Sequence, residues 1–365
     1  MIENTEVARD QSVAPVFQVM FNWQNLPQHS IKIRGLEVSS SEVDSTYKKY
    51  DLALYAQEHL DRIYLQFSYL SELFDKVTIE RMLTNFVVLL ESICDTPEQP
   101  VADLGVVSHE EYSSLLTSFN QNGASLTGEF SLAAMFDEQV KSTPNATALI
   151  HAGKRLNYTE LKELVDAIAA GLSAAGVCAG DVVALCLERG FNAVAAIVAT
   201  AKIGAVHVAI DTAYPDVHRN RILSDSKAET YLHDEAYPAT ADFAGTALSV
   251  RGLTSISSSV EAPVYRAEPE GTYNLVYTSG STGVPKGVLI PNRALQNRLE
   301  WMWREFPWQA GDVAILQKSY SIVAASWEVW GGLLKGIPTV IAEQGDLHDP
   351  ESFLKLCIEN GVSHL

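Results

Sequence analysis

The sequence predicts an α/β protein with mostly parallel sheets flanked by helices, and two observations lead to this class. Between about residues 159 and 210, helical and strand-like apolar patterns alternate in the order helix, strand, helix, strand. Such alternation is typical of parallel sheets covered by helices. Near the N-terminus, apolar and polar residues alternate in two segments, and a segment with apolar residues at helical spacing follows. This pattern indicates a second, smaller α/β unit.

The first hundred residues are predicted to contain two strands and a helix. Apolar and polar residues alternate over residues 17–23 and again over 65–69, which predicts strands with one buried face. Residues 77–94 place apolar side chains at helical spacing, so this segment should form a helix that covers a sheet. The sequence then becomes polar, and Asn120-Gln121-Asn122-Gly123 indicates a linker.

Beyond the linker the expected elements follow in order. Helices are predicted over residues 159–174 and 191–202, and strands over 182–187, 206–210, 274–277 and 287–290. Asn292 is expected to cap a helix that runs towards Arg304, because asparagine accepts hydrogen bonds from free backbone N–H groups at a helix start.

Composition limits the classes of function. The formal charge of −19 opposes binding to a nucleic-acid backbone, so no nucleic-acid partner is expected. No apolar run is long enough to cross a bilayer and the N-terminus lacks a signal peptide, so we expect a cytoplasmic protein with no membrane partner. The four cysteines are scattered, which predicts neither disulfides nor a metal site.

The segment from Tyr277 to Gly287 has the composition of a phosphate-binding loop. Glycines let the backbone approach an anion, hydroxyls can donate to phosphate oxygens, and a lysine supplies positive charge. The spacing fits neither the P-loop of nucleotide hydrolases nor the dinucleotide-binding turn. The predicted ATP phosphate-binding residues are Thr278, Ser279, Gly280, Ser281, Thr282, Gly283 and Lys286.

Ordered motifs make the second half similar to the core of a nonribosomal peptide synthetase adenylation domain. They are Leu156-Asn157-Tyr158-Thr159-Glu160-Leu161, Ala201-Lys202-Ile203-Gly204-Ala205 with Asp211 and Tyr214-Pro215, and the phosphate loop. The first hundred residues resemble the closing part of a condensation domain through Arg9-Asp10-Gln11-Ser12, Pro15-Val16-Phe17-Gln18-Val19-Met20-Phe21, Leu73-Phe74-Asp75 and Thr78-Ile79-Glu80-Arg81-Met82.

The resemblance implies a partial condensation subdomain of the chloramphenicol acetyltransferase type over residues 1–107, a linker over 108–127, and an incomplete adenylate-forming core over 128–365. The implied reaction joins a small carboxylic acid to ATP, with Mg²⁺, as an acyl-adenylate. The acyl group then passes to the phosphopantetheine thiol of a peptidyl carrier domain. If Met1 is the natural start, the module would begin a peptide chain.

The resemblance assigns no catalytic residue to this chain. In the family, the acid that holds the ATP ribose, the adenine-binding motif and the lysine of the mobile subdomain lie past the position of Leu365. The condensation motif His-His-x-x-x-Asp-Gly does not occur in this sequence. We therefore expect the chain alone to be inactive, and a non-catalytic scaffold is an alternative function.

The acyl pocket departs from the family pattern. Amino-acid-activating members carry Phe-Asp-x-Ser-x-Trp-Glu, whose aspartate pairs with the substrate ammonium, but here residues 322–328 read Ile-Val-Ala-Ala-Ser-Trp-Glu. Val323 takes the aspartate position, Ala324 and Trp327 would shape the pocket, and Glu328 is expected to point into the structure. An unpaired buried ammonium is unfavourable, so the sequence predicts an α-keto or α-hydroxy acid.

Members with this pattern often contain an inserted ketoreductase domain, so the resemblance allows that partner together with NADPH. The alternative within the same fold is ordinary amino-acid activation, with an acid elsewhere or Glu328 taking over the pairing.

Overall fold

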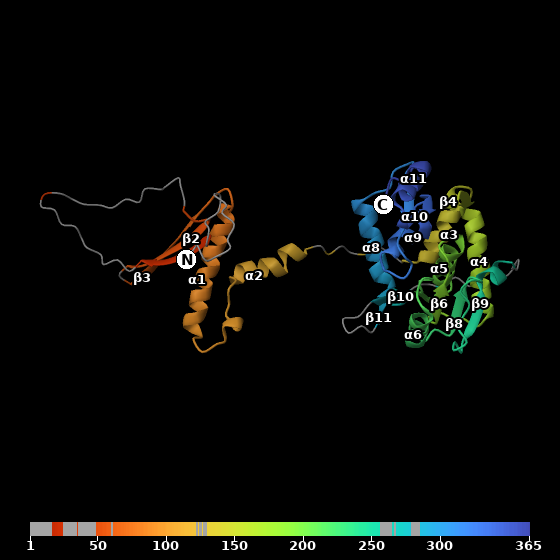
Figure 1. Cartoon of the computed structure of the whole chain (residues 1–365), viewed down its shortest axis with the longest axis horizontal. Helices are drawn as coiled ribbons and strands as arrows, with labels where there is room; N and C mark the ends of the chain where they lie inside the picture. The colour runs from red at the N-terminus through yellow and green to blue at the C-terminus, as the bar shows by residue number, and fades with distance from the viewer. Residues whose placement is uncertain are drawn as a thin grey trace, which may run out of the picture. The chain divides into compact units, whose positions relative to one another are not determined.

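The chain folds as two compact units, residues 1–124 and 125–365 (Figure 1). A computed structural model describes residues 17–24, 35, 49–59, 61–121, 123, 126, 130–255, 265, 268–278 and 285–365.

The first unit contains a three-stranded sheet and one long helix. Strand β1 (Val19–Gln24) pairs in parallel with β2 (Leu52–His59), and β2 pairs antiparallel with β3 (Arg62–Tyr69). Helix α1 (Lys76–Asp95) then packs against β3. The two strands and the helix that the sequence predicts for this region are therefore present.

The predicted buried face of residues 17–23 is wrong. Phe17, Val19, Phe21 and Trp23 are between 45% and 63% exposed. Among the described residues of this unit, the buried apolar side chains come from β2 and α1: Leu52, Ala53, Leu54, Ala56 and Ile79. Alternation predicts a strand correctly, but burial also needs a second layer, and α1 packs against β3, the strand farthest from β1 in the sheet.

The segment 108–127, predicted as a linker, begins with a helix. Helix α2 (His109–Leu116) starts after Ser108, whose side-chain oxygen accepts a hydrogen bond from the backbone N–H of Glu111. Short 3₁₀ turns precede and follow it, η2 (Val101–Asp103) and η3 (Ser118–Asn120).

The second unit is built on two sheets, both mainly parallel. In the larger sheet the order is β11-β10-β7-β6-β8-β9, and only β11 runs antiparallel to its neighbour. Its strands are β6 (Val182–Cys186), β7 (Val206–Ala209), β8 (Thr230–His233), β9 (Thr246–Ser249), β10 (Thr272–Thr278) and β11 (Lys286–Pro291). The smaller sheet has the order β12-β13-β4-β5, made of β12 (Ala314–Leu316), β13 (Thr339–Ile341), β4 (Thr147–His151) and β5 (Lys154–Asn157).

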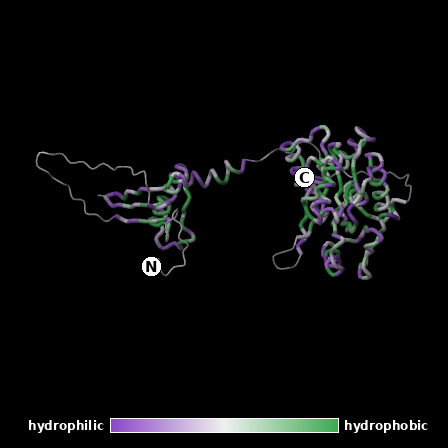
Figure 2. The backbone as a smooth tube through the Cα atoms, turned by 45° about the horizontal axis from the view of Figure 1, so that its top comes forward, coloured by the Kyte–Doolittle hydropathy of each residue, from purple (hydrophilic) through white to green (hydrophobic). Residues whose placement is uncertain are grey.

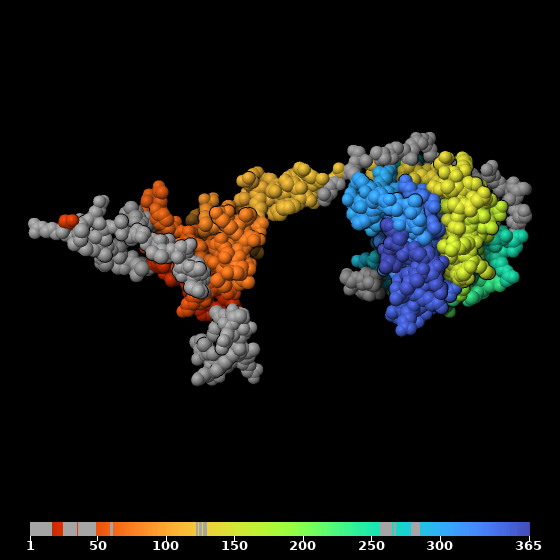
Figure 3. All heavy atoms as spheres, turned by 90° about the horizontal axis from the view of Figure 1, so that it is seen from above, coloured from red at the N-terminus to blue at the C-terminus, as the bar shows by residue number. Residues whose placement is uncertain are grey.

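Helices cover both faces of these sheets, so the α/β class with mostly parallel sheets is confirmed. They are α3 (Leu132–Ser142), α4 (Tyr158–Ala174), α5 (Phe191–Lys202), α6 (Asp216–Ser226), α7 (Val250–Thr254), α8 (Asn292–Glu305), α9 (Ala325–Leu333), α10 (Gln344–His348) and α11 (Pro350–Asn360). Figure 3 shows the C-terminal segment, which includes α11, on the outside of this unit.

Three apolar clusters define the layers of the second unit. The largest lies between the two sheets and joins Leu149 of β4 and Leu185 of β6 to buried faces of α4, α5, α8 and α9. A second cluster packs α6 on the other face of the larger sheet, and a third packs α11 on the other face of the smaller sheet. Figure 2 shows these strands as hydrophobic segments inside the unit. Successive residues of β6 point to opposite clusters, which is why the whole strand is apolar.

Helix α4 begins at a capping box. The Asn157 side chain accepts from the backbone N–H of Glu160, and the Glu160 carboxylate accepts from the backbone N–H of Asn157. The start of α8 differs from the prediction, because Pro291 precedes it and Asn292 is its first residue. Asn292 instead donates its side-chain amide to the carbonyl of Glu268 at 2.9 Å.

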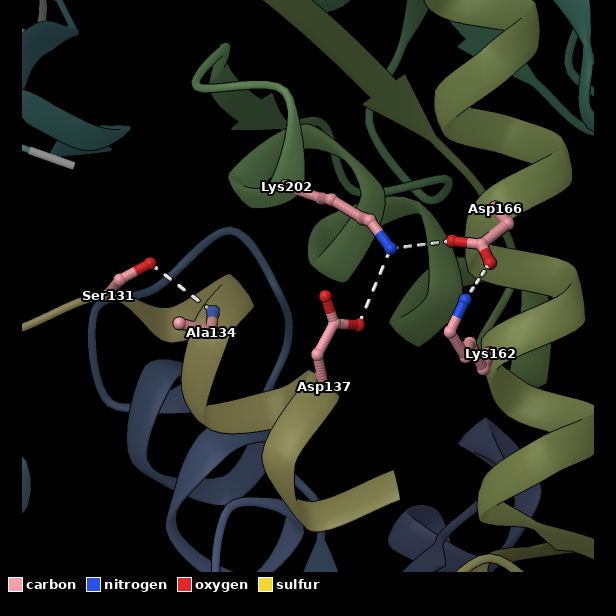
Figure 4. A network of polar contacts seen from close by, with 6 residues as sticks. All are labelled: Ser131, Ala134, Asp137, Lys162, Asp166 and Lys202. Atoms are coloured by element: carbon pink, nitrogen blue, oxygen red, sulfur yellow. Dashed lines mark hydrogen bonds and ion pairs between the residues drawn. The ribbon is translucent and has the colours of Figure 1, made fainter. Parts of the chain in front are cut away.

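A buried lysine joins three helices of the second unit (Figure 4). Lys202 ends α5 with a side chain that is 2% exposed, and its Nζ lies 2.7 Å from Asp166 Oδ1 on α4 and 3.4 Å from Asp137 Oδ1 on α3. Asp166 also pairs with Lys162. A buried charge requires such partners, so these contacts fix α3, α4 and α5 to one another.

Candidate functional site

The two ends of the predicted phosphate loop lie side by side. Thr278 ends β10 and Lys286 begins β11, and the two residues are register partners in the antiparallel hairpin. Both are exposed. A hydroxyl and an ammonium group are therefore presented at one end of the hairpin, a combination that suits phosphate oxygens. Ser279, Gly280, Ser281, Thr282 and Gly283 lie outside the described residues.

The strand before this loop is held to its neighbours. The Tyr277 hydroxyl donates to Asp225 Oδ2 of α6 at 2.6 Å. On the other side, Tyr273 lies in the core and its hydroxyl accepts from Trp330 Nε1 of α9 at 2.6 Å. Strand β10 is thus connected both to α6 and to α9, the helix that carries part of the predicted acyl pocket.

The predicted acyl-pocket residues lie at the start of α9. Val323 is 54% exposed and Ala324 is also exposed, whereas Trp327 is half-buried. Trp327 stacks on Trp308 with ring centroids 5.9 Å apart and planes within 5° of parallel. The isopropyl group of Val323 is therefore accessible to a ligand, beside a tryptophan whose orientation is fixed.

The tryptophans after the phosphate loop support α9. The indole N–H groups of Trp303 and Trp308 both donate to the carbonyl of Gly331, at 2.8 and 3.0 Å. A Cβ at Gly331 would lie 2.7 Å from the Trp327 ring, so a side chain there would displace that ring. Trp301 and Phe306 are in contact with each other and partly exposed.

Glu328 points into the structure, as predicted. Its Oε2 accepts from the backbone N–H groups of Gln317 and Lys318 at 2.8 and 2.7 Å. Burial raises the pKa of this carboxyl above its ordinary value, and the two backbone hydrogen bonds oppose that change. The carboxylate thus holds the segment between β12 and α9.

Two residues near this segment have a role that sequence reasoning missed. Arg189, in the turn between β6 and α5, donates to the carbonyls of Leu316, Lys318 and Ala342. Asp211, which follows β7, accepts from the Ser319 hydroxyl at 2.6 Å. The signal for Arg189 was present, because a charged residue at the carboxyl end of an apolar strand lies where open α/β sheets bind ligands or other segments.

A cavity of about 40 Å³ lies beside these residues. Its polar lining is formed by Arg189, Asp211, Thr212, Ser319, Tyr320, Ser321 and Gln344, and its apolar lining comes from β6, β7 and α5. Burial raises the pKa of Tyr320 to about 12, so its hydroxyl stays protonated at neutral pH.

The described part of the chain contains no cluster of three or more histidine, cysteine or acidic side chains that could bind a metal ion. The cysteines Cys94, Cys178, Cys186 and Cys357 are free thiols. In the same part of the chain, we find no helix with the length and apolar character that a membrane span needs.

Comparison with known families identifies the second unit. The family described as "AMP-binding enzyme" matches residues 136–365, which is more than half of the chain. The chain belongs to the AMP-binding enzyme family. The predicted resemblance of the second half to adenylate-forming enzymes is therefore confirmed at the level of the family, and the hairpin that brings Thr278 and Lys286 together agrees with it. The family described as "Condensation domain" matches residues 1–116, so a condensation region precedes the AMP-binding region.

Individual relatives match nearly the whole chain. Tyrocidine synthase 3 of Brevibacillus parabrevis is 30% identical over 98% of this chain, and bacitracin synthase 3 of Bacillus licheniformis is 30% identical over 100%. The chain spans only 6% of the length of each of these two relatives.

Solved structures show the same fold. The N-terminal subdomain of Klebsiella oxytoca NpsA is 28% identical, covers 65% of this chain and 61% of its own length, and has a TM-score of 0.60. The nonribosomal peptide synthetase FmoA3 is 21% identical over 95% of this chain and 37% of its own length, with a TM-score of 0.76. The similarity to FmoA3 extends over both units, and at this identity it shows the fold alone.

Proposed function

We propose that the chain is part of a nonribosomal peptide or depsipeptide synthetase module that activates a carboxylic acid without an α-ammonium group, an α-keto or α-hydroxy acid. ATP would supply the adenylate, and the acyl group would pass to the phosphopantetheine of a peptidyl carrier domain. The family match, relatives with names such as tyrocidine synthase, and an adenylation-PCP di-domain among the similar structures support the general reaction.

Thr278 and Lys286, at the two ends of the loop, are suited to bind the phosphate groups of ATP. Lys286 would pair with phosphate oxygens and the Thr278 hydroxyl would donate to them, which orients the α-phosphorus towards the carboxylate of the acid. The segment 279–284 would add the remaining donors. Mg²⁺, which the reaction class requires, would neutralise phosphate charge when bound.

The observation that supports the substrate class is the accessible Val323 at the start of α9. A substrate covering this position would meet an isopropyl group, and the nearest acid along the helix, Glu328, is engaged by two backbone N–H groups. An ammonium group placed here would lose water without gaining a counter-charge. NpsA was solved in complex with 3-hydroxybenzoyl-AMSN, whose acyl group also lacks an ammonium.

Ordinary amino-acid activation is the second candidate, and the names of the peptide synthases at 30% identity favour it. An inserted ketoreductase with NADPH, a role in chain initiation, a cytoplasmic location and a catalytically inactive scaffold are further hypotheses. We also propose the domain limits 1–107, 108–127 and 128–365, which rest on the resemblance of the sequence to condensation and adenylation domains.

The test is ATP/pyrophosphate exchange by the complete protein that contains this chain, with branched α-keto acids, the matching α-hydroxy acids and the matching amino acids. We expect exchange with the keto or hydroxy acids. Val323→Asp should raise amino-acid-dependent exchange at least about tenfold, because it restores a counter-charge. Val323→Asn is the matched control for size without charge and should not do so. Exchange of the wild type with amino acids alone would refute the proposed substrate class.

A further inference from the structure

The segment between β12 and α9 is fixed by three charged residues from three separate elements. Arg189 comes from the turn after β6, Asp211 from the end of β7, and Glu328 from α9. All three contact residues 316–319. Three charged side chains from separate parts of the chain therefore restrain one short connection.

Arg189 makes the most extensive of these contacts. Its Nε donates to the carbonyl of Ala342 at 2.7 Å, Nη1 to Lys318 at 2.9 Å and Nη2 to Leu316 at 2.8 Å. The guanidinium carbon also lies 5.6 Å from the centre of the Tyr320 ring. The planar fork of an arginine satisfies three carbonyls at the ends of β12 and β13, which a lysine ammonium could not reproduce in the same geometry.

The backbone of Lys318 is held at both its N–H and its carbonyl. Glu328 accepts from the backbone N–H groups of Gln317 and Lys318, while Arg189 donates to the carbonyl of Lys318. Ser319 then donates to Asp211 Oδ2, and Asp211 Oδ1 accepts from the backbone N–H of Ala213.

A series of turns carries this fixed geometry to the acyl pocket. The N–H of Ile322 donates to the carbonyl of Ser319, and that of Ala325 donates to Ile322. The N–H of Ser326 donates to Val323 and that of Trp327 to Ala324. The first two of these bonds share Ile322, and the next two span residues that overlap the second bond, so we expect a displacement at Lys318 or Ser319 to move Val323, Ala324 and Trp327 as well.

Packing alone does not fix this segment. The cavity of about 40 Å³ borders Ser319, Tyr320 and Ser321, so these residues have room to move on one side. The polar contacts from Arg189 and Asp211, which border the same cavity, supply the restraint that close packing gives elsewhere.

We propose that Arg189 is a positioning residue for acid selection, which acts through segment 316–324 on the residues that contact the acid. This inference rests on the proposed function for the identity of the substrate site. Asp211 acts with it through Ser319. The three N–H groups of Arg189 that the structure shows bonded all donate to backbone carbonyls, so the proposed effect on the substrate comes from holding the segment in place.

The test compares Arg189→Lys with wild type in the complete protein, using whichever acid supports pyrophosphate exchange best. We expect the KM for the acid to rise at least about tenfold, because small displacements of positioning groups are costly, while the KM for ATP changes less than about twofold. Arg251→Lys is the matched control, since Arg251 is exposed and pairs only with the exposed Glu235 at 3.4 Å in the contacts described. Ser319→Ala weakens the second contact and should raise the acid KM in the same direction, by less.

Hydrogen exchange gives a readout that does not need activity. Amides of residues 316–327 should exchange faster in Arg189→Lys than in wild type, and those of α6 should not change. An unchanged acid KM, or an equal rise in the KM for acid and ATP, would overturn the proposal. If wild type exchanges with no acid, the proposed function fails, and unchanged hydrogen exchange over residues 316–327 would then overturn the positioning role separately.

Discussion

At the scale of single residues, His207 is a buried imidazole that stays neutral. It is 3% exposed on β7, its ring meets the Tyr273 ring edge to face at 5.0 Å, and burial lowers its pKa to about 3. The unfolded chain binds a proton at this histidine below about pH 6.5, whereas the folded chain does so only near pH 3. Protonation therefore favours the unfolded state between these values.

We predict that His207→Phe removes this part of the acid sensitivity. Relative to the variant, wild type should lose about 2 kcal/mol of unfolding free energy between pH 7 and pH 5, because the loss follows the proton taken up on unfolding. Denaturant unfolding at several pH values measures it. His348→Gln, which changes an exposed histidine, is the control. Parallel pH profiles for wild type and His207→Phe would show that folding does not lower the pKa of His207.

Local sequence nominates site residues that belong to contiguous motifs. The phosphate loop and Val323 are nominated in this way and stay predictions, whereas the inward position of Glu328 is seen in its contacts with the backbone of Gln317 and Lys318. Arg189 and Asp211 act on residues more than 100 positions away, so no local pattern connects them with Ser319 or Lys318. For Asn292 the local pattern predicted the wrong role. An asparagine can cap a helix, but here its side chain donates to the carbonyl of Glu268.

At the scale of secondary-structure elements, Lys202 and its partners form the joint between α3, α4 and α5 (Figure 4). The ammonium is almost fully removed from water, and Asp166 is its nearer partner at 2.7 Å. A buried charge that loses its partner is strongly destabilising, whereas replacing the whole pair by apolar groups is often neutral.

We therefore predict that Asp166→Asn lowers the unfolding free energy by about 3 kcal/mol, because only Asp137 at 3.4 Å would still face Lys202. Adding Lys202→Met to this variant should recover most of the loss, as measured by denaturant unfolding. Glu270→Gln breaks the exposed pair with Arg293 and should cost less than about 1 kcal/mol. If the double variant is as unstable as Asp166→Asn, the buried charge is not the cause.

Helices were predicted with correct limits where the spacing of apolar residues and the residues that start or end a helix indicate the same bounds. Helix α5 has the predicted limits, and α4 differs by one residue at its capped start. Strand β1 is present but its apolar side is exposed, because alternation reports which residues share a face and not what covers it.

At the scale of the whole molecule, the two units differ in how much apolar surface they bury. All three apolar clusters of the described residues belong to the unit 125–365. Among its described residues, the first unit buries few apolar side chains and leaves those of β1 exposed. Since apolar burial is the main favourable contribution to folding, the second unit should carry most of the stability by itself.

We predict that residues 125–365, expressed without residues 1–124, unfold cooperatively with a Tm within about 4 °C of the whole chain, because a change of about 1 kcal/mol shifts a unit of this size by that amount. Calorimetry of both proteins measures it. Residues 145–365 form the control, since this cut removes α3 and with it Phe136, which is 0% exposed, and Asp137 beside Lys202. The control should lose cooperative unfolding. A Tm more than about 10 °C lower for residues 125–365 would mean that the first unit stabilises the second through contacts that its own buried residues do not provide.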